Sequence, residues 1–157
     1  MLKTTNPLLQ QTEQAIMQKI DPKLQMQLQR TVTAGLQIMY GSKDNLIAKQ
    51  LGKSSDYAHN VGEGAAKLVG ILYQQSKKTM PPSIAVPAAT IFMCEGLDFL
   101  EKAGKVKVNP DLLSEATQDM GAAVMQLFGV SPDKMQSMMA QAQQRQQPPG
   151  IIAGAGV

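Results

Sequence analysis

The feature of this sequence that most constrains its fold is a helix-capping residue that stands directly before a proline. It occurs four times, at Asn6-Pro7, Asp21-Pro22, Asn109-Pro110 and Ser131-Pro132. The capping side chain accepts a hydrogen bond from the first turn of a helix, and proline fits the first helical position because an N–H there has no partner to lose. Each pair therefore predicts the start of a helix.

Glycines predict where several helices end. Gly41, Gly52, Gly104 and Gly129 each follow the last apolar residue of a periodic segment, a common position for the glycine that closes a helix. Between these starts and stops, apolar residues recur at intervals of three and four, which is the helical period. The segment 22–40 shows the pattern with Leu24, Leu28, Val32, Leu36 and Met39.

We therefore predict an all-α fold: a compact bundle of about six or seven short helices with an extended C-terminal tail. The expected helices are 7–20, 22–40, 42–52, 56–75, one beginning after Met80-Pro81-Pro82, 110–128 and 132–146. Residues 1–131 are expected to form the bundle, and residues 132–157 a Met/Gln-rich docking helix followed by an apolar Pro/Gly tail.

The helix after Pro82 is apolar on nearly all sides in its first half, which predicts a central position in the bundle. Its later charged residues, Glu95, Asp98, Lys102 and Lys105, are expected to form a polar half. The longest apolar run, Ile84 to Cys94, contains Pro87 and is shorter than the roughly 20 residues that span a bilayer. No transmembrane segment is expected.

The reactive side chains do not form a recognisable catalytic or metal-binding pattern. His59 is the sole histidine, and Glu63 one turn later would supply only a second ligand where zinc takes three or four. Cys94 lies in the apolar run, which raises a thiol pKa and makes it inert. The acidic stripe Asp111, Glu115 and Asp119 is expected to face solvent. We expect a protein that is not an enzyme and holds no cofactor or metal.

The segment 56–75 carries small residues at steps of four: Ala58, Gly62, Ala66 and Gly70. A glycine inside a helix costs close to 1 kcal/mol relative to alanine. Two glycines on one ridge therefore predict that another backbone packs closely there, from this chain or from a neighbouring subunit.

The C-terminal region predicts a partner-binding surface. Met135, Met138 and Met139 form an apolar stripe, and Ile151 and Ile152 begin an apolar tail. A flexible methionine face on a peripheral helix is suited to docking in the groove of a partner.

Residues 46–61 allow a different interpretation, because their spacing matches a DNA-binding helix-turn-helix with small Ala48 and a turn at Gly52. The second helix would present Asp56 and Glu63 to the phosphates and contains no arginine, and the whole chain has only two. Sequence-specific binding of nucleic acid is therefore the alternative and not the expectation.

The stretch from Val61 to Lys105, VGEGAAKLVGILYQQSKKTMPPSIAVPAATIFMCEGLDFLEKAGK, is followed by a helix that closes on Phe128-GVSP and by a Gln/Pro/Gly-rich end. Together they resemble small helical virion proteins of tailed bacteriophages, over roughly residues 7–150. Such proteins are encoded among head and tail-connector genes.

The resemblance implies a structural component or an ejection protein, located in the virion and in the host cytoplasm during assembly. It implies homo-oligomers and portal, connector or ejection proteins as partners. It brings no catalytic residues.

Overall fold

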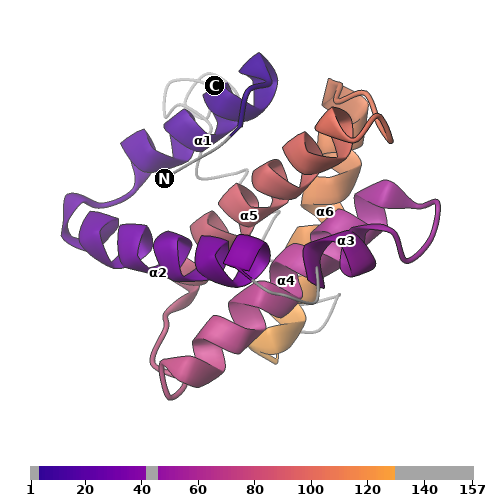
Figure 1. The fold of residues 1–157 in the computed structure, drawn as a ribbon. Coiled ribbons are helices and arrows are strands. Elements are labelled where there is room, and N and C mark those ends of the chain that lie inside the picture. Colours follow the sequence, from indigo (N-terminus) through magenta and orange to yellow (C-terminus); the bar gives the residue numbers. More distant parts are fainter. Residues whose placement is uncertain (1–3, 42–45, 130–157) are drawn as a thin grey trace, which may run out of the picture. The chain divides into compact units, whose positions relative to one another are not determined.

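The computed structural model describes residues 4–41 and 46–129, which form six α-helices and no strand (Figure 1). The helices are α1 (Pro7–Lys19), α2 (Pro22–Gly41), α3 (Leu46–Leu51), α4 (Tyr57–Gln75), α5 (Pro82–Lys102) and α6 (Pro110–Leu127). Residues 1–124 belong to one compact unit and residues 125–157 to a second. The predicted all-α class is confirmed. The predicted seventh helix, 132–146, and the tail lie outside the described residues.

Three of the four capping pairs lie among the described residues, and each caps a helix. Oδ1 of Asn6 accepts a hydrogen bond from the backbone N–H of Leu8 at 2.9 Å at the start of α1. Oδ1 of Asp21 does the same for Lys23 before α2, and Oδ1 of Asn109 accepts from Leu112 in α6. The fourth pair, Ser131-Pro132, lies outside the described residues.

Helix ends were less predictable than helix starts. Gly104 follows α5 in the left-handed region, with φ of 72°, as the sequence indicates. Gly41, in contrast, is the last residue of α2 itself. After α4, two consecutive lysines, Lys77 and Lys78, have positive φ values of 57° and 63°. The sequence has no glycine at this helix end, so it did not indicate the left-handed backbone there.

The predicted central position of α5 is confirmed. Helix α5 contacts α1, α2, α3 and α4. Its residues from 91 to 98 are all buried. By length and composition α5 is the one described helix that could cross a membrane, yet 72% of its apolar window is buried among the other helices. Its central place in the bundle accounts for that hydropathy.

The expected polar half of α5 is only partly correct. Lys102 is exposed, but Glu95 and Asp98 are 0% and 2% exposed. The difference arises because α1 packs against α5 and buries Leu9 and Glu13, whereas Ile16 is only half-buried. Glu13, Glu95 and Asp98 thus lie inside the protein, although the sequence pattern predicted a polar face for Glu95 and Asp98.

Candidate functional site

The predicted partner-binding residues, Met135, Met138, Met139, Ile151 and Ile152, lie outside the described residues. The functional features that the structure does describe are a close helix contact, a polar network, a group of buried carboxylates and the cysteine.

The helix that packs closely against the small-residue ridge of α4 is α6, at Gly62. A Cβ atom at Gly62 would lie 2.7 Å from the backbone N of Met120 and 3.0 Å from the backbone O of Ala116. Ala58 and Ala66 on the same ridge are 3% and 4% exposed, and Gly70 is half-buried. The neighbour at Gly62 is therefore the backbone of this chain and not of a second subunit.

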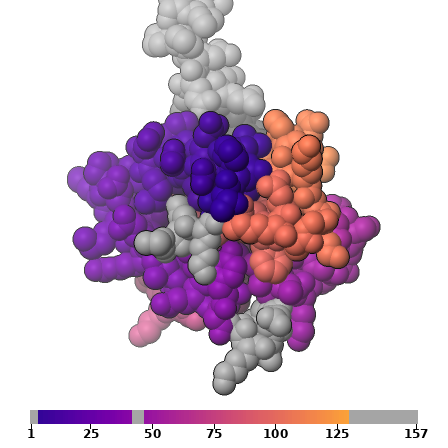
Figure 2. All heavy atoms as spheres, turned by 45° about the horizontal axis from the view of Figure 1, so that its top comes forward, coloured from indigo at the N-terminus to yellow at the C-terminus, as the bar shows by residue number. Residues whose placement is uncertain are grey.

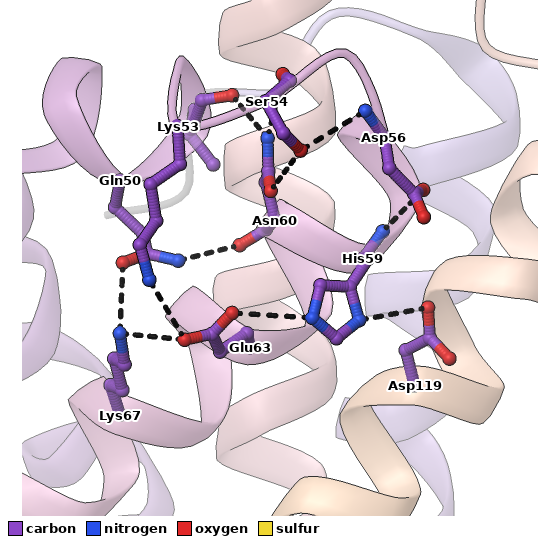
Figure 3. Close-up of polar contacts among 10 residues, drawn as sticks. Gln50, Lys53, Ser54, Asp56, His59, Asn60, Glu63, Lys67 and Asp119 are labelled. Atoms are coloured by element: carbon purple, nitrogen blue, oxygen red, sulfur yellow. Dashed lines mark hydrogen bonds and ion pairs between the residues drawn. The ribbon is translucent and has the colours of Figure 1, made fainter.

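The turn between α3 and α4 is fixed by Asn60, a buried residue of α4. Nδ2 of Asn60 donates to the carbonyl oxygens of Leu51 and Ser54, each at 3.0 Å, and Oδ1 accepts from the Ser54 hydroxyl at 3.1 Å. Nε2 of Gln50 donates to the Asn60 carbonyl (Figure 3). Asn60 thus satisfies the backbone of a turn that has few regular hydrogen bonds, and holds α3 against α4.

Glu63 is the centre of a charged network on the surface of α4 (Figure 3). Its Oε1 lies 2.7 Å from Nζ of Lys67 and 3.2 Å from Nζ of Lys53. Hydrogen bonds from these two lysines, Lys67 first, lower the pKa of Glu63 to about 2. Glu63 is therefore ionised and links the turn after α3 to α4.

His59, which the sequence analysis considered as a metal ligand and did not favour, is part of the same network. Its Nε2 lies 3.3 Å from Oε2 of Glu63, and its Nδ1 lies 3.6 Å from Oδ2 of Asp119 in α6 (Figure 3). The imidazole is 55% exposed. Within 4–41 and 46–129, no three His, Cys, Asp or Glu side chains are arranged to hold a metal ion. The contacts of His59 join α4 to α6.

The buried carboxylates of α1 and α5 form the feature that the sequence interpretation missed. Oε2 of Glu13 accepts a hydrogen bond from the Thr4 hydroxyl at 2.9 Å, and its Oε1 is buried without a partner among the described residues. Burial, reinforced by the nearby charges of Glu95 and Asp98 and opposed by the Thr4 hydrogen bond, raises the pKa of Glu13 to about 7. A signal existed, because Glu13 lies four residues after Leu9 and so on the apolar face.

The pKa of Asp98 shifts in the opposite direction to that of Glu13. It accepts hydrogen bonds from the backbone N–H groups of Thr5 and Asn6 at 3.0 and 3.3 Å, and Nζ of Lys102 lies 2.7 Å from its Oδ2. Burial alone would raise its pKa, but these hydrogen bonds outweigh burial and lower it. Asp98 and Glu101, which accepts a hydrogen bond from the Asn6 side-chain amide, hold the start of α1 against the end of α5. In Figure 2 the indigo N-terminal part of the chain lies beside the orange-red part near residue 100.

A carboxyl group with a pKa near 7 is the type that acts in general acid–base catalysis. Glu13, however, is 2% exposed, and the hydroxyl of Tyr40 donates to Oε2 of neighbouring Glu95 at 3.1 Å. Among the described residues, α1 itself carries this carboxyl group into its contact with α5. The arrangement ties α1 and α2 to α5.

Cys94 is fully buried in α5, and burial raises the pKa of its thiol. Because the thiolate is the nucleophile, we expect the native protein to react with a water-soluble thiol reagent at least about tenfold more slowly than the unfolded chain. Timed labelling with and without denaturant, followed by mass measurement, tests this. Equal rates would mean that α5 is accessible in the folded protein.

Compared with known proteins, the chain matches no family model, no curated protein sequence and no solved structure.

Proposed function

We propose that the protein is a non-enzymatic structural or ejection protein of a bacteriophage virion, which oligomerises or docks on a larger ring near the portal or tail connector. The observation that carries the proposal is that the described residues bury a continuous apolar core from Leu9 to Val124. The sequence then continues with further apolar residues, among them Met135, Met138, Met139, Ile151 and Ile152, which on this proposal dock on a partner or a second copy.

The described polar groups support a role in assembly over one in catalysis. His59 and Glu63 connect helices on the surface, while Glu13 and Cys94 are sealed between helices. His59 and Glu63 form ion pairs with neighbouring side chains, and Glu13 and Cys94 are buried. None of these four groups faces a cavity in which a nucleophile lies beside a base. The virion assignment itself rests on the resemblance of roughly residues 7–150 to small helical virion proteins of tailed bacteriophages.

A helix-turn-helix regulator remains the alternative, and one observation favours it. The backbone N–H of Gly52 donates to the carbonyl of Ala48 at 2.9 Å, and the short turn 52–56 then joins α3 to α4, an order of elements that resembles that motif. Glu63 nevertheless neutralises part of the lysine charge on α4. A gel shift with duplex DNA at low and moderate salt separates the two: a sequence preference with a steep salt dependence would favour the regulator.

The C-terminal segment provides the test of the assembly role. Deleting residues 147–157 is expected to leave the helicity and the melting temperature of the body nearly unchanged and to abolish assembly. Burial of Ile151 and Ile152 would contribute about 1.5–3 kcal/mol each, opposed by the cost of ordering the glycine-rich chain. Sedimentation velocity at rising concentration, with and without the partner particle, measures this.

Point variants sharpen that test. The double variant Ile151→Ser, Ile152→Ser should lose assembly as the deletion does, whereas Ala153→Ser, Ala155→Ser changes the same segment with little loss of apolar area. Incorporation of the truncated chain into particles as efficiently as the full chain would contradict the proposal.

A further inference from the structure

A cavity of about 370 Å³ opens where α2, α3 and α4 meet above α5. Its deepest residues are apolar: Val61 and Leu68 of α4 and Phe92 of α5 are 2%, 6% and 2% exposed. Ile71, at the next turn of α4, is 45% exposed and lies at the entrance. The volume falls in the range of about 300–1,000 Å³ that small-molecule sites occupy.

The polar residues around this cavity carry positive charge. Lys49 of α3, Lys53 of the following turn and Lys67 of α4 line it, and none of its described lining residues is acidic. Glu63, next to the cavity, pairs with Lys53 and Lys67 (Figure 3), so these two lysines are held in place and partly neutralised. Lys49 has no ion pair with any described residue, so its charge is available to a ligand.

We infer that this cavity binds a single-chain aliphatic anion, with the chain against Leu68 and Phe92 and the charged head group at Lys49. The apolar interior favours a hydrocarbon chain because it has few groups that could satisfy a polar ligand. The three lysines select an anionic head group over a neutral or cationic one. This binding site is independent of the assembly role proposed for the C-terminal segment.

Decanoate, used below its critical micelle concentration, is a suitable probe. Titration into the full chain should shift the methyl NMR signals of Leu68 and Ile71, and the melting temperature should rise as the decanoate concentration exceeds its dissociation constant. Decyltrimethylammonium, which has the same chain and the opposite charge, should bind at least about tenfold more weakly.

Matched variants assign the head-group contact. Lys49→Glu replaces an attraction by a repulsion and should weaken decanoate binding about tenfold, with less effect on neutral decanol. Lys23→Glu makes the same charge change at an exposed residue of α2 that does not line the cavity, and should leave the affinity nearly unchanged. Both side chains are exposed, so neither variant should impair folding.

A third variant tests the chain contact. Ile71→Gln removes apolar surface at the entrance and should weaken decanoate and decanol alike, by about threefold or more. Equal affinity of decanoate for Lys49→Glu and the unmodified protein would overturn the inference. Equal affinities for decanoate and decyltrimethylammonium would also overturn it. The same holds if the methyl NMR signals of Leu68 and Ile71 do not move during the decanoate titration.

Discussion

Gly62→Leu is expected to destabilise the helical body by about 3 kcal/mol or more. The backbone of α6 lies where the new side chain would begin, with the N of Met120 2.7 Å from the position of a Cβ atom. Backbone atoms of a packed helix cannot rotate away as a flexible side chain can, so α4 and α6 must move apart and lose contacts. Chemical denaturation monitored by circular dichroism measures the change.

The matched control is Gly121→Ala, because Gly121 lies on α6 itself and a Cβ atom there would meet nothing within 4 Å. It should stabilise the protein by about 0.5–1 kcal/mol, the ordinary gain for removing a glycine from a helix. If the leucine variant does not fold, Gly62→Ala can be measured in its place. It adds only the Cβ atom that would lie too close to α6, and it should also destabilise the protein. An unchanged or raised melting temperature for Gly62→Leu would show that α6 does not pack closely there.

Glu13→Gln is expected to change how stability depends on pH. The pKa of Glu13 is raised in the folded protein from its ordinary value of 4.5 to about 7. The folded state therefore favours the protonated form, and the contribution of this group is fully present below pH 4.5 and is lost as the pH rises towards 7. At about 1.4 kcal/mol per pKa unit, the loss is about 3 kcal/mol as an upper bound.

Glutamine has the shape of the protonated acid and does not ionise. The variant should therefore match the unmodified protein near pH 4.5 and exceed it in the free energy of unfolding by about 2–3 kcal/mol at about pH 8. Asp98 does not interfere, because its pKa is lowered and its stabilising contribution is lost only in more acidic solution. Glu115→Gln, at an exposed position of α6, is the control and should show no such trend. Parallel pH profiles for Glu13→Gln and the unmodified protein would contradict the burial of this carboxyl.

Helix starts could be predicted from sequence because they depend on local chemistry. A cap such as Asn6 or Asn109 bonds to an N–H two or three residues away, so the signal and its effect lie in one short segment. The central position of α5 was also predictable, since a helix that is apolar on all sides has to be enclosed.

The buried carboxylates were not predicted, because their burial depends on which helix lies opposite. The sequence of α5 alone places Glu95 and Asp98 on a polar face. In the folded protein the start of the chain and Tyr40 of α2 cover them. Gly35 shows the same limit. A Cβ atom there would lie 2.1 Å from Cζ of Phe92, and two residues so far apart in the chain give no local signal of that contact.

The most direct test of the proposed assembly role is the mass at which the native protein sediments in extracts of cells that carry its gene. Density-gradient sedimentation followed by detection of the chain gives this mass whichever partner is bound. The account predicts that the chain migrates with particles many times heavier than its own 16.9 kDa, and that deletion of residues 147–157 moves it to the light fractions. Migration of the full chain as a 16.9 kDa monomer at every stage of particle formation would contradict it.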